Sequence, residues 1–154
     1  NLMKVILLEN LKKIGSIGEV IDVKRGFARN FLIANKKALY ASKENIKQVE
    51  KIKSELSKKD DEKKINAKKI SEKINKKEYA VSKLSTENKE LYGSVKPTEI
   101  SKIIYETSKI EIKPSMIQPI KEIKSIGKFR VKVSLHSEVE AEITVIVNSA
   151  ETIQ

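Results

Sequence analysis

The chain has 154 residues, no cysteine, one histidine and a formal net charge of +11. These numbers exclude a disulfide framework and a metal site built from thiolates or several histidines, and no apolar run approaches the length of a membrane span. A basic surplus of this size is typical of proteins that bind nucleic acid or an anionic membrane surface. Because only 39% of the residues are hydrophobic and 5% aromatic, two small domains are favoured over one large core.

Residues 1–41 predict a small basic N-terminal domain. Gly15 and Gly18 mark a turn between two short apolar segments, and we expect Met3 to be the natural start because the first of these segments begins there. The predicted elements are strands at 3–8 and 19–23, a short helix at 26–33 and an extended segment at 36–40.

The stretch 23–42 carries the strongest functional signal. It interleaves lysines and arginines with one Gly-Phe pair and one Asn-Phe pair. No acidic residue lies between Asp22 and Glu44. Cations suit phosphates, ring faces suit unstacked bases, and a glycine allows two backbones to approach, so the pattern predicts RNA binding. The predicted RNA-binding residues are Lys12, Lys13, Lys24, Arg25, Gly26, Phe27, Arg29, Asn30, Lys36 and Lys37.

Several of these positions also have a structural interpretation. Phe27 suits either the core or a base, and Asn30 suits either a helix cap or a sugar contact. The glycines at 15, 18 and 26 are expected to serve backbone conformation. The residues expected in the core are Val23, Phe31 and Leu32.

A long helix is predicted to follow, because residues 27–92 contain neither glycine nor proline. Ser42 is its expected N-cap, and the connector spans 42–78. Apolar residues lie at both ends of this helix, and we expect its start, to about residue 56, to complete the N-terminal domain. The charged run 57–64 offers no face to bury. A coiled coil is the rival interpretation, but the heptad pattern fails across this run.

Residues 79–154 predict a nearly neutral α+β domain. Thr98 is expected to cap a helix, and the alternation in 109–113 predicts a strand. Two alternating segments form a hairpin whose expected apolar pairs are Val131 with Ile143, Val133 with Ala141, and Leu135 with Val139. Weaker candidates for RNA contact in this domain are Gly93, Ser94, Lys96, Lys128, Arg130 and His136.

An enzyme is not favoured. The Gly15-Ser16-Ile17-Gly18 segment lacks the spacing of a dinucleotide or phosphate-binding loop. His136 and the nearby glutamates suggest an acid–base site at first, but strand alternation places those glutamates on a solvent face. A basic spacer or adaptor on an anionic surface, such as a membrane, is the other alternative, although the charged run provides no wide apolar stripe to face lipid.

The N-terminal pattern carries a family resemblance through the spacing G-x-x-G-x-x-x-x-V-x-x-G-F-x-x-N-F-L. The residues that realise it are Gly15, Gly18, Val23, Gly26, Phe27, Asn30, Phe31 and Leu32. With the opening MKVILLE, the long helix, LYGSVKPTEI at 91–100 and the hairpin at 123–147, the chain resembles the bacterial large-subunit ribosomal protein L9 family. It departs from the family at Ala34 and Lys36, where a proline and a glycine are usual, so we expect a different local turn and an added phosphate contact from Lys36.

The resemblance implies two small α+β domains joined by a long exposed α-helix, with a three-stranded antiparallel sheet in the N-terminal domain. It also implies binding of 23S rRNA near the base of a mobile stalk, contacts with other large-subunit components, and support of reading-frame fidelity in translation. No catalytic activity, cofactor or membrane partner is implied. We further expect a cytoplasmic location on the ribosome and a monomer off it.

Overall fold

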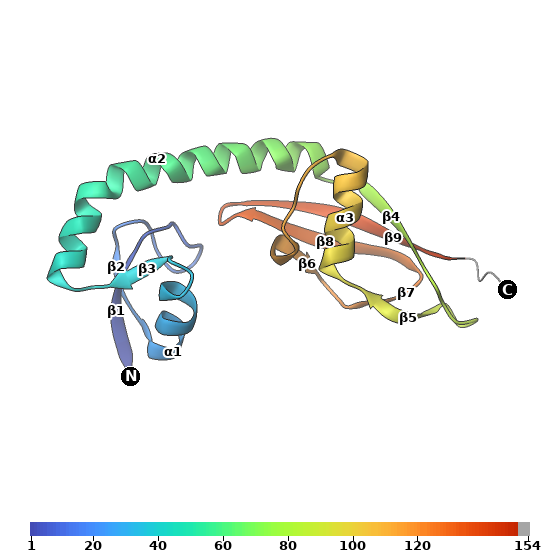
Figure 1. Cartoon of the computed structure of the whole chain (residues 1–154), viewed down its shortest axis with the longest axis horizontal. Helices are drawn as coiled ribbons and strands as arrows, with labels where there is room; N and C mark the ends of the chain where they lie inside the picture. Colours follow the sequence, from blue (N-terminus) through green and yellow to red (C-terminus); the bar gives the residue numbers. More distant parts are fainter. Residues whose placement is uncertain (151–154) are drawn as a thin grey trace. The chain divides into compact units, whose positions relative to one another are not determined.

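The computed structural model describes residues 1–150, so residues 151–154 of the predicted second domain lie outside the described part. The chain forms two compact units, Asn1–Ile65 and Asn66–Gln154. Helix α2 (Lys43–Ile74) runs without interruption from the first unit into the second (Figure 1). The predicted fold class, two small α+β domains joined by a long helix, is therefore confirmed.

A three-stranded antiparallel sheet forms the centre of the first unit, as the resemblance implied. Its strands are β1 (Leu2–Leu7), β2 (Val20–Lys24) and β3 (Ala38–Tyr40), in the order β2-β1-β3. Successive side chains of a strand point to opposite faces, and Val5, Ile6 and Leu7 of the central strand are all fully buried. Both faces of β1 are therefore covered, which is why this strand is apolar at consecutive positions.

A short two-part helix covers one face of this sheet. It comprises α1 (Arg25–Phe27) and the π-helical segment η1 (Ala28–Ile33), close to the predicted 26–33. Ala28 and Leu32, four residues apart, are fully buried in the same cluster as Val5 and Leu7. The spacing of four places both residues on one face of the helix, which leaves the opposite face to solvent.

The turn after this helix keeps a left-handed backbone although lysine occupies the position. Lys36 has φ 56°, its N–H donates to Ile33 O at 3.0 Å, and the N–H of Lys37 donates to Leu32 O at 2.7 Å. These two bonds form a Schellman motif, which favours glycine at the left-handed residue. The departure from the family at Lys36 therefore places a strained lysine in a turn whose geometry suits glycine.

We expect the substitution Lys36→Gly to stabilise the first unit by about 1 kcal/mol, because a Cβ in the left-handed region costs on that order. The measurement is the protection of β1 amides in hydrogen exchange of the full chain, which reports opening of this unit. Lys36→Ala is the matched control: it removes the same charge, keeps the Cβ and should gain little. Equal stabilities of the two variants would contradict the assignment of strain to Lys36.

Helix α2 begins as predicted but is not free of contacts in its charged run. Ser42 is the N-cap, since its Oγ accepts the N–H of Asn45 at 3.1 Å. Val49 is fully buried, whereas Ile52 is 39% exposed. The expectation that 57–64 packs on nothing is wrong, because Asn10 Nδ2 donates to Asp60 Oδ2 at 3.0 Å and Asp60 is partly buried.

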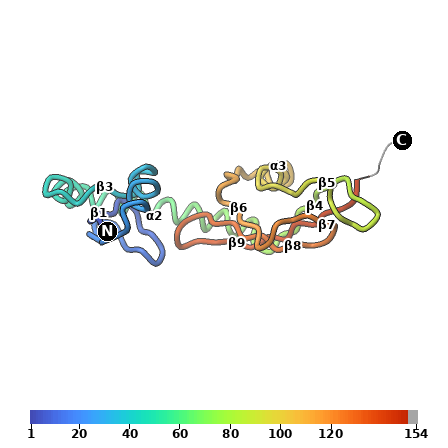
Figure 2. Tube along the Cα trace, turned by 90° about the horizontal axis from the view of Figure 1, so that it is seen from below, coloured from blue at the N-terminus to red at the C-terminus, as the bar shows by residue number. Residues whose placement is uncertain are grey.

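The second unit contains a four-stranded sheet with the order β4-β9-β8-β6. Helix α3 (Pro97–Ser108) contributes the fully buried Ile100 and Ile104 to its core, and Figure 2 shows this helix on one side of the β8–β9 hairpin. The strands are β4 (Glu78–Lys83), β6 (Ile117–Pro119), β8 (Gly127–His136) and β9 (Val139–Ser149), with β5 (Glu90–Val95) and β7 (Ile123–Ser125) as a separate pair and the 3-10 turn η2 (Pro114–Met116) before β6.

The predicted hairpin register is confirmed along its length and wrong at its tip. Val131 pairs with Ile143 and Val133 with Ala141, as expected. Val139 pairs with His136 instead of Leu135, because the ladder shifts between Ser134 and His136. Such a bulge places an extra residue on one strand, and here it permits a tight turn that is closed by an N–H···Nδ1 bond from Glu138 to His136 at 3.1 Å.

Two further local predictions in this unit are wrong. The segment 109–113 is not a strand: Lys109 ends α3 in a left-handed conformation, and no described strand pairs with the segment. Its alternation reflects burial, since Ile112 is 2% exposed. Thr98 is not the helix cap, because α3 starts at Pro97 and Lys96 precedes it, with the Lys96 N–H donating to Glu99 Oε2 at 2.9 Å.

Candidate nucleic-acid interface

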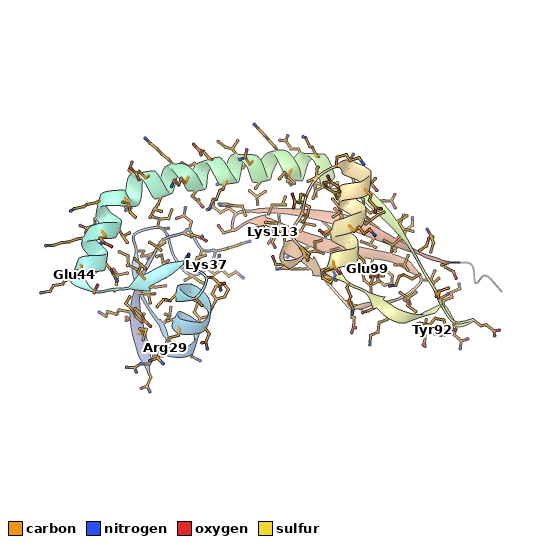
Figure 3. All side chains as sticks on the ribbon, in the orientation of Figure 1. Arg29, Lys37, Glu44, Tyr92, Glu99 and Lys113 are labelled. Carbon is orange, nitrogen blue, oxygen red and sulfur yellow. The ribbon has the colours of Figure 1, made fainter. Side chains whose placement is uncertain are left out.

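The short helix carries half of the predicted RNA-binding residues. Lys24 precedes the helix, and Arg25, Arg29 and Asn30 are exposed on it, whereas Ala28 and Leu32 are buried. Figure 3 labels Arg29 on this helix and Lys37 after it, next to β3 (Ala38–Tyr40). Asn30 lies inside η1 and not at its end, so its interpretation as a helix cap is wrong.

Two phenylalanines form an exposed pair on this helix. Phe27 is 39% and Phe31 is 40% exposed; their rings stack with centroids 5.2 Å apart and planes 19° from parallel. The expectation that Phe31 belongs to the core is wrong, whereas Leu32 is buried and Val23 packs against the core as expected. The available signal was the spacing of four from Phe27 to Phe31, which puts both rings on one face of a helix.

Lys37 supports the aromatic pair. Its Nζ lies 5.8 Å from the centroid of the Phe31 ring, within the range of a cation–π contact. The same Nζ is 3.2 Å from Glu9 Oε2, and the lysine side chain is 28% exposed. Lys37 is therefore held between a ring and a carboxylate, while the other predicted cations of this segment are exposed.

Gly26 is not needed for the backbone of the helix. Its φ lies outside the left-handed region, and a Cβ added there would meet no atom within 4 Å. Glycine in a helix is about 1 kcal/mol less favourable than alanine, so the expected conformational role is wrong for this position. Gly18, with φ +83°, does require glycine. Gly26 is exposed next to Phe27 in the chain, and the absence of a side chain there allows a ligand backbone to approach closely.

A second group of cations lies on the loop between β1 and β2. Lys12 and Lys13 are exposed at its tip, inside the bridge that joins Leu11 to Gly15. The backbone of Lys13 is in the left-handed region, with φ 67°. All predicted RNA-binding residues thus belong to the first unit, and all but Lys37 are exposed.

Two of the weaker candidates of the second unit, Lys128 and Arg130, lie on a surface where charges alternate in sign. Lys128 is 3.7 Å from Glu78, Arg130 is 3.8 Å from Glu142, and Lys132 is 3.6 Å from Glu140. Exposed pairs of this kind add little stability, but they neutralise the outer face of the hairpin. This face therefore offers phosphate a weaker field than the exposed helix of the first unit. Gly93, Ser94, Lys96 and His136 remain predictions.

Within residues 1–150, no helix has the length and apolar character that crossing a bilayer requires. The same residues contain no group of three or more acidic or histidine side chains placed to hold a metal ion.

Two family models match the chain. The model described as "Ribosomal protein L9, N-terminal domain" matches residues 3–49, and "Ribosomal protein L9, C-terminal domain" matches residues 65–149. A protein from Pelagibacter ubique (strain HTCC1062) named "Large ribosomal subunit protein bL9" is 79% identical over 152 residues, which cover 99% of this chain and 100% of that protein. Proteins of the same name from Paracoccus denitrificans (strain Pd 1222) and Bartonella quintana (strain Toulouse) are 41% and 39% identical, covering 97% of this chain and 77% and 76% of theirs.

Proposed function

Because the chain belongs to the ribosomal protein L9 family, it is a structural, rRNA-binding constituent of the large ribosomal subunit and not an enzyme, and we propose that its N-terminal unit binds 23S rRNA. Its predicted cytoplasmic location on the ribosome follows from that membership.

The observation that carries this proposal is the exposed stack of Phe27 and Phe31 among cations. Large apolar rings placed together on a surface usually mark a binding site. Here the rings belong to a stretch that is rich in lysine and arginine and has no acidic residue from 23 to 43, and Lys37 Nζ lies 5.8 Å from the Phe31 ring. Aromatic rings stack with unpaired bases, and the cations bind the phosphates on either side. A single-stranded nucleic acid satisfies both parts of this surface, and membership of the ribosomal protein family favours rRNA as that ligand.

The finer assignments are also proposals. We infer that the protein is a monomer off the ribosome, that other large-subunit components contact it, and that α2 carries the second domain in a role that supports reading-frame fidelity. The neutralised hairpin surface of the second unit supports this division of labour, because it leaves the main electrostatic attraction to the first unit.

The competing possibility is a basic spacer or adaptor that binds any anionic surface. We expect the full chain to bind a 23S rRNA transcript in filter-binding assays at 0.15 M salt and not to float with liposomes that contain about 30% phosphatidylserine, because stacking needs bases and charge attraction alone is screened. Equal retention on rRNA and on liposomes, with the same salt dependence, would favour the adaptor instead.

A further inference from the structure

Asn10 joins the loop that carries Lys12 and Lys13 to helix α2. Its Oδ1 accepts the N–H of Ile17 at 2.9 Å, across the loop. Its Nδ2 donates to Asp60 Oδ2 at 3.0 Å, on the fifth turn of α2. An amide side chain accepts through its oxygen and donates through its nitrogen, so this one side chain both closes the loop and attaches it to the helix.

A second contact fixes the other side of the loop to the same helix. Gly18 is left-handed, and a Cβ added there would lie 3.1 Å from Lys53 Cδ, so the aliphatic part of Lys53 passes over this glycine. Lys53 and Asp60 are seven residues apart, which is about two helical turns and places both on the same face of α2. Ile17, between the two contacts, is 4% exposed. The loop thus lies against α2 along two turns.

The tip of the loop is itself ordered by its backbone. Leu11 N–H donates to Gly15 O at 2.8 Å and Gly15 N–H donates to Leu11 O at 3.0 Å. At its base, Leu7 N–H donates to Glu19 O and Gly18 N–H donates to Leu7 O, at 3.0 and 2.9 Å. Because backbone hydrogen bonds close both the tip and the base, the position of Lys12 and Lys13 depends on how the whole loop is held, and Asn10 is the loop side chain whose hydrogen bond attaches it to α2.

We propose that Asn10 is a positioning residue for RNA binding: through Ile17 and Asp60 it holds Lys12 and Lys13 in a fixed place relative to α2, so that bound RNA sets the direction in which α2 leaves the first unit. The proposal rests on the proposed function, since it assumes that the first unit binds rRNA. The proposal gives Asp60, in the charged run of α2, the role of anchoring the loop. Asp60 is then more than a solvent-exposed charge on the helix.

A pair of isomeric double variants tests the role of Asn10 without a change of net charge. In N10D/D60N the carboxylate moves to position 10 in the loop and the amide moves to position 60 on α2. The amide then donates to the carboxylate from the helix side, which restores the hydrogen bond between the loop and α2. N10D/D61N has the same composition but leaves two carboxylates facing each other, because Asp61 is exposed and turned away by about 100° along the helix. The full chain and a 23S rRNA transcript are used in filter binding at several salt concentrations.

We expect N10D/D60N to bind within about twofold of the wild type and N10D/D61N to bind about fivefold or more weakly, as is usual for coupled neighbours. The slope of log K against log salt should also fall by about 1 for N10D/D61N, because the loop lysines lose phosphate contacts. Equal affinities of the two double variants would overturn the role of Asn10. Failure of the wild type to bind the transcript would overturn the proposed function instead.

A second pair of variants keeps the test informative if N10D/D61N does not fold. Asp60→Ala and Asp61→Ala each remove one carboxylate from α2, and alanine favours the helix in both. Charge alone predicts the same small gain in RNA affinity for both variants. We expect Asp60→Ala to bind at least about threefold more weakly than Asp61→Ala, and equal binding would overturn the proposal.

Discussion

Replacing Lys24, Arg25 and Arg29 together by alanine is expected to weaken binding of the full chain to a 23S rRNA transcript by on the order of 100-fold at 0.15 M salt. All three side chains are exposed around the helix that carries the phenylalanine pair. Each phosphate contact that is lost removes about 0.7 to 0.9 from the slope of log K against log salt. Filter binding over a range of salt concentrations measures both quantities.

The fold should survive this change, because none of the three side chains belongs to the buried cluster of the first unit. The matched control removes the same charge from exposed positions of the second unit: Lys68→Ala, Lys69→Ala and Lys102→Ala. If both triple variants lose the same affinity, binding depends on net charge alone. If the first triple variant stays within about twofold of the wild type with its β1 amides protected, the cations of the helix are merely solvated.

Replacing Phe27 and Phe31 together by leucine is expected to weaken binding by about 10- to 100-fold while leaving the salt slope unchanged. Stacking of a base on an aromatic ring contributes about 1 to 3 kcal/mol per base, and leucine keeps an apolar surface but removes the ring face. The unchanged slope separates this effect from a loss of phosphate contacts. The same filter-binding series provides the measurement.

Tyr40→Leu is the control for this prediction. Tyr40 is 45% exposed on β3 of the same unit, so the substitution removes an exposed ring outside the helix that carries the phenylalanine pair. We expect RNA affinity to change by less than about twofold. An equal loss in the two variants, or no loss in the phenylalanine variant, would contradict a stacking role for the exposed pair.

The sequence by itself determined the features that depend on local spacing. The absence of glycine and proline from 27 to 92, with a serine at the cap position, predicts the long helix and its start at Lys43. Alternation of apolar and polar residues determines the hairpin register up to its tip, because a slip by one residue would turn the apolar row of Val131 and Val133 toward solvent. The basic-aromatic run likewise located the candidate interface in the first unit.

Only the tertiary structure decided which of two possible faces or partners a segment uses. Phe31 and Leu32 are adjacent and apolar, and the position of the sheet determines that Leu32 is buried while Phe31 remains exposed. The segment 109–113 alternates like a strand, but no strand within residues 1–150 pairs with it; its alternation reflects the burial of Ile112. Asn10 and Asp60 are fifty residues apart. Neither residue type nor local spacing indicates such a contact, since it depends on the direction in which the chain returns.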